Sequence, residues 1–160
     1  MGTNENDTGL AELMERGGIF NDIEGTTPRE VLSAFIQALP PMSVPVNELL
    51  EAVLEREALM STSVGRGIAL PHPRNPIITS AADQFVALAF LKKGVEWNSL
   101  DGKPVDTLIL IISASAKQHL NILSRINFFC QQEEFSQLLK ERAGGEELLR
   151  FIREAEKNWK

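Results

Sequence analysis

One segment in the first third of the chain has its apolar residues at helical spacing and clear signals at both ends. Thr27, Pro28 and Glu30 supply an N-cap, a first-turn proline and the carboxylate of a capping box. The apolar positions that follow recur every three or four residues: Val31, Leu32, Phe35, Ile36 and Leu39. The adjacent prolines at positions 40 and 41 predict that the helix ends there.

Four later segments also have the pattern of helices. The first begins near Pro45, has its buried stripe at Val46, Leu49, Leu50, Val53 and Leu54, and ends close to Arg56 and Glu57. Ser115 and Gln118 form a second capping box, which opens a helix carrying Leu120, Leu123, Ile126 and Phe129. Residues 133–141 and 146–155 predict two more helices, separated at Gly144-Gly145.

Strand patterns lie between these helices. Residues 84–91 and 105–112 are the strongest strand segments, and the second is apolar enough to be buried on both faces of a sheet. Residues 98–102 have turn chemistry, and the short apolar run 68–70 suits a strand that ends in a shaped loop. Helices before, between and after strands predict an α/β fold with a mixed β-sheet and helices on both faces.

Length and composition place limits on the class of protein. The 160 residues fit one domain, which we assign to residues 10–160, after a polar, flexible N-terminal tail at residues 1–9. A net charge of -6 argues against nucleic acid as a partner. The sequence has no secretory signal and no apolar run of the ~18 residues that a membrane span needs. A single cysteine, Cys130, is interpreted as a packed thiol in a reducing cytosol, so we expect a cytoplasmic protein.

The residues also restrict the chemistry. The chain has two histidines, His72 and His119, and they lack the spacing of zinc ligands, so no metal site is expected. It contains no G-x-S-x-G nucleophile motif, no P-loop and no dinucleotide-binding glycine pattern, so no nucleotide cofactor is expected either. An imidazole that can attack phosphorus is the chemistry that remains.

His72 is the better placed of the two imidazoles. It stands between Pro71 and Pro73, which restrict its backbone. Thr62, Ser61 and Arg56 could donate to a phosphoryl group there, and the helix start predicted before His119 favours a nearby anion and a neutral ring. Simpler interpretations stay open: His72 as a turn residue, His119 as a packed side chain, the two hydroxyls as caps, and Arg56 as a helix-end charge.

These residues resemble a known signature. Arg56-Glu57, Ser61-Thr62, Gly65, Gly67 and residues 68–72 resemble the active-site motif of the mannitol/fructose class of enzyme IIA of the bacterial sugar phosphotransferase system, which includes the nitrogen-type enzyme IIA. Residues 94–106 look like the hairpin of that family, and His119-Leu120 is similar to its second histidine motif. The resemblance runs from about residue 10 to residue 153, and it is closest to the nitrogen-regulatory type.

The resemblance implies a protein-histidine phosphotransferase component with an α/β sandwich fold. His72 would accept a phosphoryl group from an HPr-like carrier and pass it to an enzyme IIB, or hold it as a signal to regulatory target proteins. The implied catalytic set is His72, His119, Arg56 and Thr62, supported in phosphate binding by Ser61, Gly65 and Arg74. The family needs neither a metal nor a nucleotide.

The sequence departs from the usual pattern at three places. Pro73 and Ser63 stand where the family usually has glycine, which stiffens the loop and bears on partner fit. Residues 113–115 lack the proline that related chains often carry before the second histidine. We still expect a phosphoacceptor, because Pro71-His72 is intact.

Three functions remain open. The chain could be a regulator of the nitrogen type, a fructose- or mannitol-specific transport component, or a binding module of the same fold that is no longer phosphorylated. No IIB-, IIC- or HPr-like segment is apparent in the sequence, and this favours the regulator as the expectation.

Overall fold

The computed structural model describes residues 8–158, so residues 1–7 of the predicted N-terminal tail lie outside the described residues. The described chain forms a five-stranded mixed sheet in the order β1-β4-β5-β3-β2. In that order, the strands are β1 (Gly18–Ile23), β4 (Phe85–Val95), β5 (Val105–Ile112), β3 (Ile68–Ala69) and β2 (Ser63–Gly65). The helices are α1 (Leu10–Gly17), α2 (Pro28–Ala38), α3 (Val46–Leu59), the short 3-10 helix η2 (Ala81–Asp83), α4 (Ala116–Cys130), α5 (Glu133–Lys140) and α6 (Gly145–Lys157).

The two most apolar strands form the centre of the sheet. β4 and β5 pair in antiparallel register from Phe85 opposite Ile112 to Phe90 opposite Thr107. Seven of the eight residues of β5 are buried, with Asp106 as the exception. A strand that is apolar along nearly its whole length has no face to turn to water, so it takes a central position with helices on both sides.

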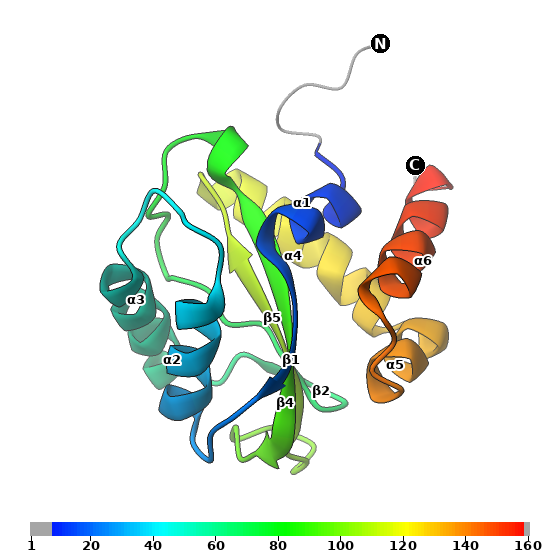
Figure 1. Ribbon diagram of the computed structural model, residues 1–160, viewed down its shortest axis with the longest axis horizontal. Helices are drawn as coiled ribbons and strands as arrows, with labels where there is room; N and C mark the ends of the chain where they lie inside the picture. The colour runs from blue at the N-terminus through cyan, green and yellow to red at the C-terminus, as the bar shows by residue number, and fades with distance from the viewer. Residues whose placement is uncertain (1–7, 159–160) are drawn as a thin grey trace.

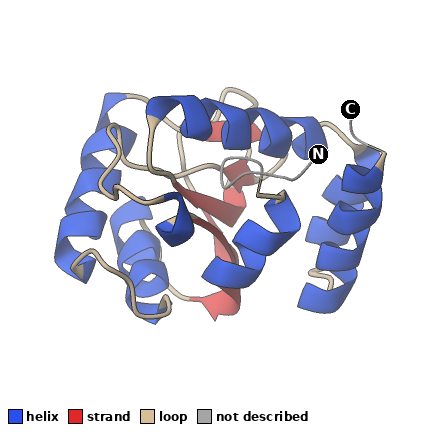
Figure 2. Cartoon of the chain, turned by 90° about the horizontal axis from the view of Figure 1, so that it is seen from above, coloured by secondary structure: helices blue, strands red, loops and turns tan. Residues whose placement is uncertain are grey.

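Helices cover both faces of the sheet, as the sequence predicted. α2 and α3 pack on one face, and α1, α4, α5 and α6 pack on the other (Figure 1). The view from above shows the strands enclosed between these two layers (Figure 2). Alternate residues of the central strands divide between the layers: Leu108 and Leu110 face α2 and α3, whereas Ile109 and Ile111 face the other helices.

The predicted capping signals are found where the sequence placed them. The Thr27 hydroxyl accepts from the Glu30 N–H at 3.2 Å, and the Ser115 hydroxyl accepts from the Gln118 N–H at 3.2 Å. One detail differs, since the Glu30 carboxylate accepts from Thr26 N–H and Oγ1. In a standard capping box this carboxylate accepts from the N–H of the N-cap, Thr27, whereas here its partner is the residue before it.

Four elements were absent from the sequence prediction: α1, β1, and the short β2 and η2. β1 pairs in parallel with β4, far along the chain, so no local turn announces it. α1 has only eight residues, but its Leu10, Leu13 and Met14 are buried against the helical layer of α4 and α6. β4 also extends past the predicted residue 91 to Val95, where it pairs with Val105 across the hairpin.

Gly17 at the end of α1 offers a test of this packing. A Cβ added there would lie 2.2 Å from the carbonyl oxygen of Val86, and the backbone of β4 cannot move aside as a side chain can. We expect Gly17→Ala to lower the free energy of unfolding by about 3 kcal/mol, at the upper end of overpacking costs. The matched control is Gly144→Ala, at a site with no atom within 4 Å, where we expect a change within about 1 kcal/mol in urea unfolding. Equal losses in the two variants would contradict the packing described for α1.

Candidate active site

The direction of two neighbouring strands brings the two histidines together. β3 and β5 run parallel, with Ile68 opposite Thr107 and Ala69 opposite Leu108. The loop after β3 and the start of α4 after β5 therefore leave the sheet at the same edge. The Ile111 N–H donates to the Pro71 carbonyl at 3.1 Å, which holds the loop against β5.

The ring of His72 is held by its own loop. Its Nδ1 lies 2.7 Å from the carbonyl oxygen of Leu70. A carbonyl oxygen only accepts, so Nδ1 carries the proton in this hydrogen bond and Nε2 keeps the unshared electron pair. The side chain is partly exposed, whereas Leu70 and Pro71 are buried. The loop thus presents one ring nitrogen as a nucleophile and fixes the other as a donor.

His119 is the second imidazole of the site. It lies in the first turn of α4, where its backbone N–H donates to the Ser115 carbonyl at 2.9 Å. The centroids of the His72 and His119 rings are 4.5 Å apart, with the ring planes tilted by 40°. Two rings this close pack against each other, so a small group bound to a nitrogen of one ring also lies near the other ring.

Both histidines favour the neutral form. Burial lowers the pKa of His72, and the charge of Arg56 lowers it further, against the opposing effects of the Leu70 hydrogen bond and Glu57. Burial, with His72 and Arg56, lowers the pKa of His119 to about 4. A neutral His72 near neutral pH has the electron pair that attack on phosphorus requires.

The pKa of His119 has a consequence for stability. The unfolded ring takes a proton near pH 6.5, whereas the folded ring resists protonation down to about pH 4. The unfolded state therefore binds more protons between these values, so the free energy of unfolding should fall as the pH is lowered through this window. We expect His119→Gln to flatten that dependence, measured by urea unfolding at about pH 7 and about pH 5. An identical pH dependence in the variant would contradict the partial burial of this ring.

Arg56 and Arg74 supply positive charge beside the two rings. Arg56 lies in the last turn of α3, where its Nη1 donates to the Met60 carbonyl at 2.7 Å. Both arginines line a cavity of about 590 Å³ between α3 and the loop after His72. Arg74 also lines a smaller cavity of about 220 Å³ with His119. The structure therefore brings Arg56 close to both rings and places Arg74 with His119 along one cavity.

The predicted hydroxyl groups are already engaged in the chain's own structure. Thr62 Oγ1 donates to Glu57 Oε1 at 2.7 Å, and Ser61 Oγ donates to the Trp97 carbonyl at 2.5 Å. Thr62 is 7% exposed. These contacts give both residues a part in holding the segment after α3, so their hydroxyl protons point to protein acceptors in this structure.

Gly65 has a different constraint from the rest of the predicted set. It belongs to β2, with φ +85°, and a Cβ there would lie 3.3 Å from Asp101 Oδ2. The Arg66 N–H donates to the same carboxylate oxygen at 3.0 Å. Gly65 thus serves the turn between β2 and β3, which leads into β3 and the His72 loop.

Glu57 was part of the sequence signature but had no role assigned to it. Its carboxylate accepts from both the N–H and the hydroxyl of Thr62, at 2.7 Å each. The sequence held one signal for this role: Glu57 is a carboxylate near the predicted end of a helix, five residues before Thr62 of the same signature. Only the course of the chain between α3 and β2 shows that the two residues meet.

Three exposed apolar side chains lie on the segments that carry Arg56 and His119. Leu59 is 63% exposed and lines the cavity with Arg56, whereas Leu120 is 64% exposed and lines the cavity with His119. Met60, next to Leu59, is 72% exposed. Apolar residues grouped around a polar site are typical of a surface that contacts another protein.

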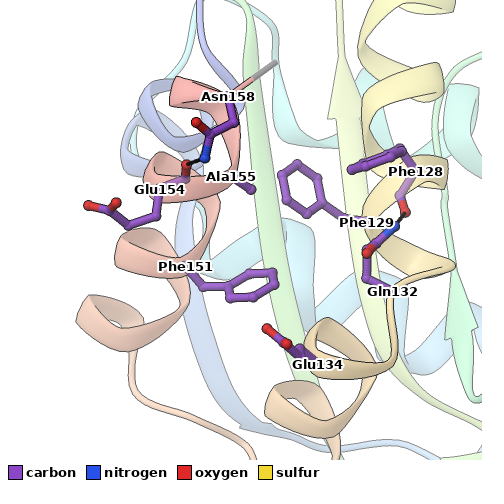
Figure 3. A pocket seen from close by; sticks show the side chains of 8 residues that line it. All are labelled: Phe128, Phe129, Gln132, Glu134, Phe151, Glu154, Ala155 and Asn158. Carbon is purple, nitrogen blue, oxygen red and sulfur yellow. Dashed lines mark hydrogen bonds between the residues drawn. The ribbon is translucent and has the colours of Figure 1, made fainter.

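Another cavity lies in the helical layer of α4, α5 and α6 (Figure 3). It measures about 750 Å³, and its described lining is Phe128, Phe129, Gln132, Glu134, Phe151, Glu154, Ala155 and Asn158. This lining offers no imidazole, unlike the cavity that His119 lines. Within residues 8–158, no three His, Cys, Asp or Glu side chains are grouped as a metal site would need. No helix of that described part combines the length and the apolar character needed to span a bilayer.

Curated proteins provide two informative relatives. The fructose-specific EIIABC component of Bacillus subtilis is 28% identical over 153 residues, which cover 92% of this chain and 24% of that protein. The chain therefore spans about a quarter of the length of that relative. The mannitol-specific enzyme IIA component of Staphylococcus aureus is 25% identical over 147 residues, which cover 92% of this chain and 99% of that protein.

Solved structures share the fold. The nitrogen regulatory protein IIA-Ntr of Neisseria meningitidis superposes with a TM-score of 0.77 at 23% identity, covering 89% of this chain and 98% of that one. The mannitol enzyme IIA of Escherichia coli was solved in its complex with phosphorylated enzyme IIB. It superposes with a TM-score of 0.63 at 18% identity, covering 84% of this chain and 93% of that one. A family model for EIIA 2 of the phosphoenolpyruvate-dependent sugar phosphotransferase system matches residues 12–155. The chain belongs to this EIIA type 2 family, whose members are phosphotransferase components that carry phosphohistidine.

Proposed function

We propose that this EIIA domain carries its phosphoryl group on Nε2 of His72. The hydrogen bond of 2.7 Å from Nδ1 to the Leu70 carbonyl is the observation that supports this most strongly. It fixes the tautomer whose free electron pair is on Nε2. The lowered pKa of His72 keeps that pair unprotonated near neutral pH.

The transfer step conserves every atom. The Nε2 electron pair of His72 forms a new P–N bond while the P–N bond of the donor's phosphohistidine breaks and its electron pair returns to the donor ring. The proton on Nδ1 stays in place, and the Leu70 carbonyl stabilises the positive charge that develops on the phosphorylated ring. The same step in reverse passes the phosphoryl group to an acceptor.

Arg56, His119 and Arg74 form the electrostatic part of the proposed site. Charge on the phosphoryl oxygens spreads in a loose transition state, so cations and donors near those oxygens lower the barrier. Arg56 acts on both rings, and Arg74 lines one cavity with Arg56 and another with His119. Thr62, Ser61 and Gly65 contribute by shaping the chain that leads to the loop, through the contacts described above.

The donor in this proposal is an HPr-like carrier, and an enzyme IIB is one acceptor. The surface around His72 supports contact with folded proteins, because Leu59, Met60 and Leu120 are exposed beside the charged groups. The solved E. coli complex joins the mannitol enzyme IIA to phosphorylated enzyme IIB, which supports a IIB-type acceptor for this chain as well.

We further propose that the chain acts as a regulator of the nitrogen type. The superposition on the Neisseria nitrogen regulatory protein, with its TM-score of 0.77, supports this interpretation at the level of shape. Coverage of 99% of a stand-alone mannitol component supports the alternative, a transport component that passes phosphate to a IIB domain. The two functions differ in where the phosphoryl group goes next.

Phosphotransfer in vitro tests the proposal. The protein is mixed with phosphoenolpyruvate, the upstream enzyme I and either a sugar-type or a nitrogen-type HPr, and trypsin then separates His72 (residues 67–74) from His119 (residues 118–125). We expect about 80 Da on the first peptide alone, the mass of one phosphoryl group. Adding a fructose- or mannitol-type IIB domain drains the label if the chain is a transport component and leaves it if it is a regulator. Absence of label from both donors would leave only the non-phosphorylated binding module.

A further inference from the structure

The carboxylate of Glu57 is connected to the phosphoacceptor ring through two intervening residues. Both donors of Thr62 point to it: the N–H to Oε2 and Oγ1–H to Oε1, each at 2.7 Å. Glu57 lies in the last turn of α3 and is half-buried. A carboxylate offers only acceptors, and its charge strengthens both bonds, so this pairing holds Thr62 in one orientation.

Thr62 passes this constraint to the loop that holds His72. Its carbonyl accepts from the Leu70 N–H at 3.1 Å, which extends the β2–β3 pairing by one residue pair. The Leu70 carbonyl in turn accepts from His72 Nδ1 at 2.7 Å. Leu70 is 2% exposed and Thr62 7% exposed, so these bonds are protected from competition with water.

The position of the Leu70 carbonyl determines which nitrogen of His72 is protonated. If this carbonyl rotated away, the ring could exchange between its two tautomers, and a proton on Nε2 would block attack on phosphorus. The energy difference between imidazole tautomers is small enough for one well-placed hydrogen bond to decide it. The groups that fix Leu70 therefore act on the reaction without touching the phosphoryl group.

We propose that Glu57 is a positioning residue for phosphotransfer: through Thr62 and Leu70 it keeps the proton of His72 on Nδ1 and the electron pair on Nε2. This inference rests on the proposed function of His72. It assigns Thr62 to the same relay, with its hydroxyl bound to Glu57.

Glu57→Gln tests the relay with little change in size. The glutamine amide keeps one oxygen that can accept from Thr62, but an NH2 group replaces the other oxygen. That NH2 group only donates and would face a donor of Thr62, so one of the two hydrogen bonds is lost. We expect the rate of phosphorylation of His72 to fall about 10-fold, the cost of about one such hydrogen bond. Nitrogen NMR of the unphosphorylated protein should show Nδ1 protonation in the wild type and a mixture of tautomers in the variant. Because the negative charge of Glu57 raises the pKa of His72, that pKa should also fall in the variant.

Two other variants separate positioning from general destabilisation. Glu48→Gln makes the same charge change in the first turn of α3, at an exposed residue, and should leave the rate and the tautomer unchanged. Thr62→Val removes only the hydroxyl bond and keeps the N–H bond to Glu57, so it should give a smaller change in the same direction. Thr62→Val also serves as the test if Glu57→Gln fails to fold.

The two proposals fail in different ways. Lack of phosphorylation of His72 in the wild type would overturn the proposed function. Normal phosphorylation of the wild type, with the rate and the tautomer of His72 unchanged in folded Glu57→Gln and Thr62→Val, would overturn the role of Glu57 alone. A mixed tautomer that appears in Glu48→Gln as well would also overturn it.

Discussion

Replacement of His72 by glutamine is expected to reduce phosphorylation of the chain to background. The variant lacks the only nitrogen with an unshared pair that the loop presents, and an amide nitrogen is a poor nucleophile. Glutamine retains an N–H that can donate to the Leu70 carbonyl, so the loop should keep its shape. The measurement is intact-mass spectrometry after incubation with phosphoenolpyruvate, enzyme I and HPr, for which we expect less than about 1% of the wild-type label.

This result depends on a folded variant. His72 is partly exposed, so its replacement leaves no buried cavity, and the thermal unfolding temperature should stay close to that of the wild type. Undiminished labelling of a folded His72→Gln would mean that another side chain is the acceptor.

Replacement of His119 by glutamine should slow transfer while leaving the acceptor in place. His119 lies 4.5 Å from His72 between ring centroids, and its own pKa of about 4 makes it a neutral donor before phosphorylation. A phosphoryl dianion on His72 reverses the local electrostatics, because a nearby negative charge raises the pKa of an imidazole. His119 can then stabilise the charge on the phosphoryl oxygens, a contribution of the order of 10²-fold in rate.

Single-turnover kinetics measure this second effect. His119→Gln should still take up one phosphoryl group on the peptide of residues 67–74, but its transfer from HPr and to the acceptor should be on the order of 10²-fold slower. A variant that transfers at the wild-type rate would remove His119 from the mechanism. A variant that takes up no phosphoryl group at all would instead make His119 the acceptor or a structural requirement for it.

The sequence predicted the parts of the fold whose signals are local. The N-caps at Thr27 and Ser115 are made by side chains a few residues from their partners, and the apolar run 105–112 coincides with β5. β1 escaped prediction because the strand that it pairs with, β4, lies more than sixty residues away along the chain. Parallel pairing over such a distance leaves no turn residue in the sequence to mark it.

The sequence indicated which residues belong to the candidate site, but not which contacts these residues make with one another. The spacing of residues around His72 led to the family resemblance, but the approach of His119 depends on the parallel pairing of β3 with β5. The residue type of Thr62 alone suggested a hydroxyl that donates a hydrogen bond to a phosphoryl group. Its bond to Glu57 depends on how the chain turns between α3 and β2, and no pattern of residues encodes that turn.

The central claim is that the phosphoryl group binds Nε2 of His72 while Nδ1 keeps its proton. Long-range proton–nitrogen NMR of the ¹⁵N-labelled, phosphorylated protein, together with phosphorus NMR, observes both nitrogens of the ring directly. The structure predicts phosphorus bonded to Nε2 and a slowly exchanging proton on Nδ1 held by the Leu70 carbonyl. Phosphorus on Nδ1 of His72, or on either nitrogen of His119, would contradict it.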